Sequence, residues 1–171
     1  MADENFMQRC IDLSREAVRK GEKPFASILV KDGEVIAESI NLTESQGDIT
    51  AHAEILVLRE AQRLVGDNLQ DCTLYTNCEP CAMCSFASRV LYVGEVVFAV
   101  RSPLMGGFSR WDILDDKNPT TSRLLLDRPT KVIAGFMEDE AAKVFKEQPR
   151  ALFGLPAKDG GLGVTSWDDA A

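Results

Sequence analysis

Residues 50–54 read Thr-Ala-His-Ala-Glu, and residues 80–84 read Pro-Cys-Ala-Met-Cys. Cys81 and Cys84 are three residues apart, so on a helix they share one face and can bind one ion together. His52 is the single histidine of the chain, and its neutral imidazole would be a suitable third ligand. We therefore predict a Zn²⁺ site made of His52, Cys81 and Cys84. Three protein ligands leave one position of a tetrahedral ion open, as in catalytic sites.

Glu54 follows His52 by two residues, which on an ideal helix places the two side chains roughly 160° apart around the axis. Both can serve one site only if that site lies beyond the helix N-terminus. A metal at two helix N-termini meets this condition. The positive ends of the helix dipoles would also favour thiolates over thiols there.

The remaining cysteines leave other interpretations of the motif open. Cys78 precedes Cys81 by three residues, which allows a closed structural zinc site of three cysteines and His52, and two cysteines at this spacing are also typical of a redox pair. A closed structural zinc site leaves the His-Ala-Glu order unexplained. An iron–sulfur cluster would need Cys72, which falls on a predicted strand. We interpret Cys10 and Cys72 as small core residues.

Around these motifs, helical and strand periodicities alternate along the chain. Thr50 is predicted to cap the helix after His52, Pro80 to occupy the first position of the next helix, and Asp32-Gly33 to form a hairpin turn. This order predicts a layered α/β sheet with sites at strand-to-helix loops. The predicted helices span 3–20, 50–66, 80–92 and 138–148; the predicted strands span 25–30, 34–40, 72–76, 95–100 and 131–136; a short helix at 111–114 is possible within the irregular segment 102–127.

Length and charge limit the classes of function. The 171 residues predict one domain over 1–153, followed by a tail over 154–171 that is either a lid or disordered. Nineteen Lys and Arg against 27 Asp and Glu give a net charge of −8, which argues against a broad nucleic-acid surface and favours a small substrate. Five cysteines and a start without a leader predict a cytoplasmic protein, and no apolar run suggests a membrane span.

The order H-x-E followed by P-C-x-x-C resembles the signature of the zinc-dependent cytidine deaminase superfamily. Residues 21–101 are most similar to the branch of guanine deaminases and tRNA adenosine deaminases. Residues 23–26 resemble the P-F-G-A stretch of guanine deaminases, from which Ser27 departs modestly, and residues 77–81 resemble their S-C-E-P-C. The resemblance implies a three-layer α-β-α sandwich around a mixed five-stranded sheet, and a homodimer.

The resemblance also implies a mechanism. Zinc lowers the pKa of its bound water, the hydroxide attacks the ring carbon that bears an amine, and Glu54 carries the protons. Asn41 would bind the substrate ring, Ala53 would offer a backbone contact and Phe25 would line the pocket. Without the resemblance, Asn41 is as readily a turn residue that ends a strand.

The substrate is expected to be a free base or related amino-heterocycle, with guanine the leading case. A cytosine-type base and adenosine in tRNA are the alternatives, the latter served by a local patch of Arg89, Arg101 and Arg110. A zinc-stabilised binding module is the alternative that is not an enzyme, and the presence of Glu54 argues against it. Phe108 and Trp111 either stack on a planar ring or belong to the core. Apolar positions of the 80–92 helix serve the core or a dimer interface.

Overall fold

A computed structural model describes residues 2–116 and 129–147. Asp3 caps the first helix by accepting a hydrogen bond from the backbone N–H of Asn5. The expected tail over 154–171 and residues 117–127 of the irregular segment lie outside the described residues. In chain order the helices and strands are α1 (Glu4–Arg19), β1 (Ala26–Lys31), β2 (Glu34–Ile40), α2 (Thr43–Gln46), α3 (Ala53–Val65), β3 (Cys72–Cys78), α4 (Ala82–Val90), β4 (Glu95–Val100), β5 (Lys131–Ala134) and α6 (Glu138–Lys146).

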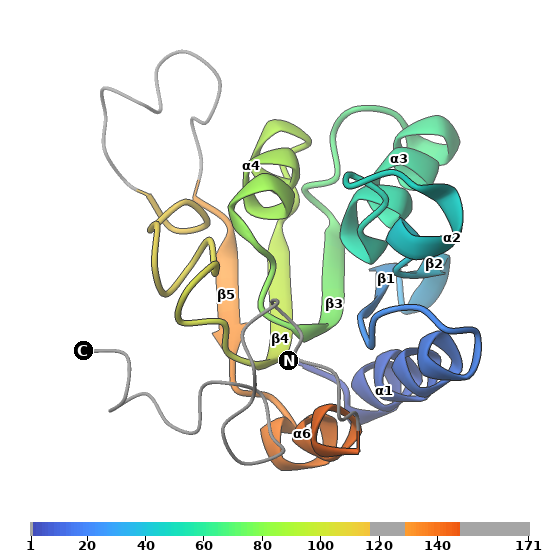
Figure 1. Ribbon diagram of the computed structural model, residues 1–171. Coiled ribbons are helices and arrows are strands. Elements are labelled where there is room, and N and C mark those ends of the chain that lie inside the picture. Colours follow the sequence, from blue (N-terminus) through green and yellow to red (C-terminus); the bar gives the residue numbers. More distant parts are fainter. Residues whose placement is uncertain (1, 117–128, 148–171) are drawn as a thin grey trace.

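The five strands form one mixed sheet in the order β2-β1-β3-β4-β5 (Figure 1). β1 pairs antiparallel with β2 and with β3, whereas β3, β4 and β5 run parallel. The hairpin between β1 and β2 turns at Asp32 and Gly33, both with positive φ, as an Asp-Gly turn requires. The predicted mixed five-stranded sheet is confirmed.

Helices cover both faces of the sheet, so the molecule has three layers (Figure 1). Alternate residues of each strand point to opposite faces, as neighbours in β3 illustrate. Tyr75 packs in the cluster beneath α1 and α6, and Leu74 packs in the cluster beneath α3. The predicted α-β-α sandwich is confirmed, and none of the described helices is long and apolar enough to cross a membrane.

The predicted starts of α3 and α4 are each two residues too early. The hydroxyl of Thr50 donates to Asp48 instead of capping α3, and His52 is the N-cap. The carbonyl of Pro80 accepts a hydrogen bond from the backbone N–H of Gly107, and Cys81 is the N-cap of α4.

Two loops also differ from expectation. The polar segment after β2 contains the single helical turn α2, and residues 111–114 form turns and bends instead of a helix. The other elements match the predicted ones with boundaries shifted by a few residues, as with β3, which continues to Cys78.

Candidate active site

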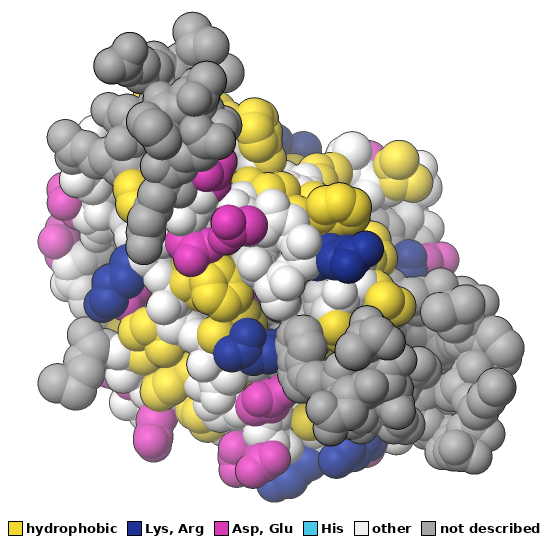
Figure 2. All heavy atoms as spheres, turned by 90° about the vertical axis from the view of Figure 1, so that its left-hand side faces the viewer, with side chains coloured by type: hydrophobic (Ala, Val, Ile, Leu, Met, Phe, Trp, Pro, Cys, Tyr) yellow, Lys and Arg dark blue, Asp and Glu magenta, His cyan; other side chains and the backbone are white. Residues whose placement is uncertain are grey.

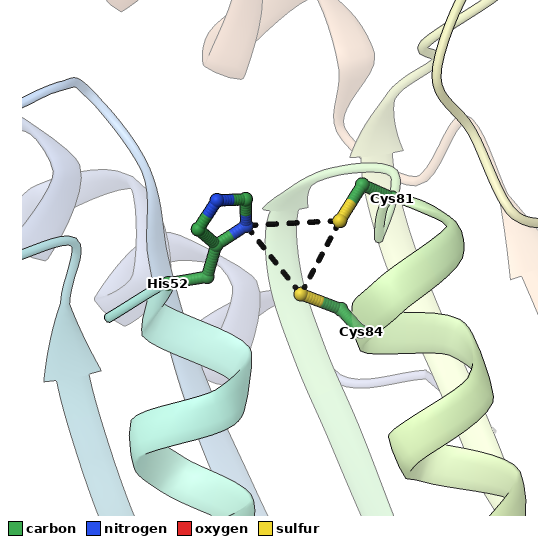
Figure 3. A group of neighbouring side chains, drawn as sticks. All are labelled: His52, Cys81 and Cys84. Atoms are coloured by element: carbon green, nitrogen blue, oxygen red, sulfur yellow. Dashed lines mark hydrogen bonds between the residues drawn. The ribbon is translucent and has the colours of Figure 1, made fainter. Parts of the chain in front are cut away.

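The two motifs meet at the carboxyl end of β3, where α3 and α4 begin. His52 is the N-cap of α3 and Cys81 the N-cap of α4, and Cys84 lies one turn further along α4. Figure 3 shows the imidazole from one helix turned toward the two sulfurs of the other. The prediction that the site lies beyond two helix N-termini is confirmed.

The spacing of the three side chains fits a zinc ion. Nδ1 of His52 lies 3.7 Å from the sulfur of Cys81 and 3.5 Å from that of Cys84, and the two sulfurs are 3.6 Å apart. Tetrahedral zinc, with bonds of about 2.3 Å to sulfur and about 2.1 Å to nitrogen, sets sulfurs about 3.8 Å apart and sulfur and nitrogen about 3.6 Å apart. Among the described residues the cluster has these three members. Cys78 is not one of them, so a closed site with three cysteines gains no support.

The two thiols have opposite proton affinities. Hydrogen bonding with Cys84, together with His52, lowers the pKa of Cys81 to about 4. The same contact and burial raise the pKa of Cys84 well above its ordinary value. The opposite directions follow from the contact between the two sulfurs, and a bound zinc ion would deprotonate both thiols, because coordination favours the thiolate.

Glu54 lies in the first turn of α3 and is only 6% exposed. Burial, followed by the negative charge of Cys81, raises the pKa of Glu54 to about 7. A carboxyl group with a pKa near neutrality can both accept and donate a proton at physiological pH. The structure places this group against the metal cluster.

A cavity of about 140 Å³ opens beside the cluster. Asn41 contributes its amide, and the direction of that amide is fixed: Oδ1 accepts from the backbone N–H of Thr43 at 3.0 Å and from its hydroxyl at 2.7 Å. The NH₂ group of Asn41 is therefore the part that remains to donate to a ligand. The cavity is lined by Lys23, Phe25, Asn41, His52, Glu54, Cys78, Glu79, Cys81, Ser102 and Met105.

A family model described as the cytidine and deoxycytidylate deaminase zinc-binding region matches residues 1–100. The chain belongs to this deaminase family. Its members are zinc hydrolases of C–N bonds, so the resemblance in the two motifs is confirmed, as is zinc as the cofactor that His52, Cys81 and Cys84 can hold.

The relatives of this deaminase include tRNA-specific adenosine deaminases and a guanine deaminase. A tRNA-specific adenosine deaminase of Aquifex aeolicus is 39% identical over 118 residues, 68% of this chain and 78% of that protein. A guanine deaminase of Bacillus subtilis is 45% identical over 86 residues, 49% of this chain and 55% of that protein. A solved structure from a study of tRNA:A34 deaminases superposes with a TM-score of 0.70 and 31% identity, covering 83% of this chain and 99% of the other.

Sequence reasoning missed half of the cavity lining in this deaminase. The sequence indicates Cys78 only as a ligand of a closed zinc site, and Glu79 only as part of the resemblance to S-C-E-P-C, so neither was expected at the cavity. Ser102 and Met105 lie in the loop after β4, for which the sequence gives no helical or strand period. Lys23 could have been expected at the cavity, because it lies two residues before Phe25, which was predicted to line the pocket.

Three further expectations can be placed. The side chain of Ala53 is fully buried, so only its backbone could meet a substrate. Phe108 packs edge-on against Phe98 with ring centroids 6.0 Å apart, as a core residue. Trp111 is 56% exposed and lies against Arg110.

The proposed basic patch is wrong for Arg89. This side chain is 2% exposed and donates to the backbone carbonyls of Ile113 and Leu114, so it cannot reach a phosphate. Its charge holds the loop after β4 in place.

Proposed function

We propose that this deaminase releases ammonia from a free nucleobase or related amino-heterocycle, with guanine the leading candidate. The observation that carries the proposal is the buried Glu54 carboxyl beside the metal cluster, in a cavity of about 140 Å³. Pockets for larger ligands usually measure about 300 Å³ or more, so this cavity suits a single base.

The chemistry follows from the residues around the cavity. When bound, zinc supplies the Lewis acidity that makes a water molecule acidic near neutral pH. Glu54 would accept a proton from the water that adds to the amine-bearing carbon and pass it to the neighbouring ring nitrogen. It would then take the second proton, from the hydroxyl now on that carbon, and deliver it to the amine as the C–N bond breaks and ammonia leaves. The Asn41 NH₂ group donates to an acceptor on the ring and orients it, and Phe25 packs against the ring face.

The charge of the chain supports a free base over a polyanion. The net charge is −8, and RNA binding depends on lysines and arginines that neutralise phosphates. On the face shown in Figure 2, most described Lys and Arg side chains stand apart, with acidic and apolar side chains between them. Lys23 at the cavity is paired with Glu44 at 3.3 Å.

Adenosine in tRNA is the second candidate, because one specific observation favours it. The match to the tRNA-specific adenosine deaminase of Aquifex aeolicus covers 68% of the chain, whereas the match to the guanine deaminase covers 49%. A base flipped out of an RNA loop would also fit a small cavity.

One assay separates the two candidates. Zinc-loaded protein is incubated with guanine, cytosine, adenine, their nucleosides, and an anticodon stem-loop that contains adenosine, and ammonia is measured. Release from guanine would support the proposal. Release from the stem-loop alone would overturn it in favour of tRNA, and release from cytosine alone would identify a cytosine-type enzyme. If zinc is bound but no compound of the panel releases ammonia, a zinc-stabilised binding module is favoured.

We further propose a cytoplasmic homodimer. Thiolate ligands persist in a reducing compartment, and all five cysteines are free. α4 exposes Met83, Phe86 and Val90, which recur on one helical face and form an apolar surface suited to a second copy. Phe86→Glu should convert the dimer to a monomer in light scattering, whereas Leu64→Glu on α3 should not; a monomeric wild type at micromolar concentration would contradict the dimer.

A further inference from the structure

Glu79 is a buried carboxylate that the chemistry above does not use. It follows the end of β3, lies 3% exposed and lines the cavity. None of the ion pairs found among the described residues includes it. A buried carboxylate without a cationic partner needs hydrogen-bond donors directed at both of its oxygens.

Those hydrogen bonds all come from one loop, residues 102–109. Oε2 accepts from the backbone N–H of Ser102 at 2.8 Å and from the hydroxyl of Ser109. Oε1 accepts from the backbone N–H of Phe108 at 3.1 Å and of Ser109 at 2.7 Å. The 102–109 loop therefore wraps around the carboxylate, with three backbone donors turned inward.

The loop approaches so closely that glycine is required at its turn. A Cβ built on Gly106 would lie 2.0 Å from Oε1 of Glu79 and 2.6 Å from the carbonyl oxygen of Ser102. A Cβ on Gly107 would lie 2.0 Å from the hydroxyl of Ser85, on α4. Neither position has room for a side chain without displacing the loop.

The same loop is bound to the segment that carries the metal ligands. The backbone N–H of Gly107 donates to the carbonyl of Pro80 at 2.8 Å, and that of Ala82 donates to the carbonyl of Met105 at 3.1 Å. These bonds flank Cys81. Met105 and Ser102, at the other side of the loop, line the cavity.

From these contacts we infer that Glu79 is a positioning residue: it holds the 102–109 loop as one wall of the substrate cavity and fixes that wall relative to the Cys81 turn. The inference rests on the proposed deamination at this cavity. Glu79 itself does not exchange protons in the reaction. It sets where Met105 meets the substrate, and so the fit of the ring.

Glu79→Gln tests the inference, because the amide keeps the size of the side chain but turns an NH₂ group toward backbone N–H donors. We expect zinc content to stay near the wild-type value and KM for the best substrate of the panel to rise about tenfold or more, with a smaller loss in kcat. Glu79→Asp keeps the charge and should recover part of the loss. A purely structural role would lower the active fraction and leave KM unchanged. Glu60→Gln, an exposed carboxylate on α3, is the matched control.

Gly106→Ala changes the same contact from the loop side and remains informative if Glu79→Gln does not fold. It should raise KM in the same direction. An unchanged KM in both variants, with zinc bound, would overturn the inference.

Hydrogen exchange gives a readout that needs no substrate. Glu79→Gln should speed exchange of the amides of Ser102, Phe108 and Ser109 while the amides of α3 keep their wild-type rates. If the variant exchanges these loop amides faster but the wild type is inactive on the whole panel, the proposed function is rejected and the role of Glu79 in holding the 102–109 loop is retained. If loop exchange in Glu79→Gln equals that of the wild type, the role of Glu79 in holding the 102–109 loop is rejected even when the enzyme is active.

Discussion

At the scale of single residues, His52 and Glu54 take different tasks although they are two positions apart. His52 is the N-cap of α3 and has extended backbone angles, so its ring reaches beyond the helix toward α4. Glu54 is inside the first turn and buried, which raises its pKa to about 7. Because the backbone changes from extended at His52 to helical at Glu54, both side chains can face the same site.

Glu54→Gln is predicted to retain zinc and the fold but to lose catalysis. The amide has nearly the size of the carboxyl group but cannot carry protons between the attacking water and the leaving amine. Loss of general acid–base catalysis costs about 10²- to 10⁴-fold, and we expect a loss at the upper end of this range in kcat. Ammonia release per zinc atom measures it.

His52→Ala is the complementary change, because it removes a ligand and not a proton carrier. Zinc content measured by atomic absorption should fall strongly in this variant and stay near wild type in Glu54→Gln. Full zinc occupancy in His52→Ala would contradict the ligand assignment, and unchanged turnover in Glu54→Gln would remove Glu54 from the mechanism.

At the scale of elements, the single-turn helix α2 depends on a side chain from outside it. Its N-cap, Leu42, offers no capping hydrogen bond, and the carboxylate of Glu22 instead accepts from the backbone N–H groups of Glu44 and Ser45 at 3.1 and 2.9 Å. Asn41 accepts from Thr43, the first residue of the same turn. α2 therefore fixes the amide that lines the cavity.

Glu22→Gln is predicted to destabilise the protein in a pH-dependent way. Burial raises the pKa of Glu22, but hydrogen bonds from Ser45 and Glu44 outweigh it, and the pKa falls below its ordinary value of 4.5. A lowered pKa means that the carboxylate stabilises the fold above pH 4.5 and loses this contribution as the pH falls through its folded pKa. Urea unfolding at pH 7 should give a loss of about 1–2 kcal/mol in the variant.

Below the folded pKa of Glu22, the same comparison should give a much smaller difference between wild type and variant, because both side chains are then uncharged. Glu60→Gln serves as the exposed control and should change the free energy of unfolding little at either pH. An equal loss for Glu22→Gln at both pH values would show that the charge of Glu22 is not what holds α2.

The sequence predicted those elements whose signal is local. Helical and alternating periods identified α1, α3 and the five strands, and the histidine and cysteine spacing identified the metal cluster. The wall formed by Met105 and Ser102 could not be predicted in this way. The loop after β4, which carries this wall, is held by two distant side chains. Glu79 binds backbone groups that lie 23 and 30 residues further along the chain, and Arg89 binds backbone groups 24 and 27 residues further along. The starts of α3 and α4 were predicted two residues early, because the Thr50 hydroxyl is bound to Asp48 and the helical backbone begins only after His52 and Cys81.

At the scale of the whole molecule, both helical layers reach the site. α3 and α4 supply the metal cluster from one face of the sheet. From the opposite layer, Phe145 of α6 packs against Phe25 at the cavity, with ring centroids 5.7 Å apart. The cavity is thus closed by elements far apart in sequence, and its shape depends on the packing of the complete sandwich.

Zinc should stabilise the whole sandwich, because the ligand atoms come from two helices that begin 29 residues apart in the sequence and lie side by side on one face (Figure 1). An ion that binds only the folded chain at 1,000 times its dissociation constant adds about 4 kcal/mol. For a domain of this size that corresponds to a rise in Tm of roughly 8–16 °C. Removing zinc with a chelator should lower the calorimetric Tm by this amount, and His52→Ala, which cannot hold the ion, should show no further shift on chelation. A wild type whose Tm is unchanged after verified zinc loss would mean that the helix N-termini are held by their packing alone, and that the metal serves chemistry without contributing to the fold.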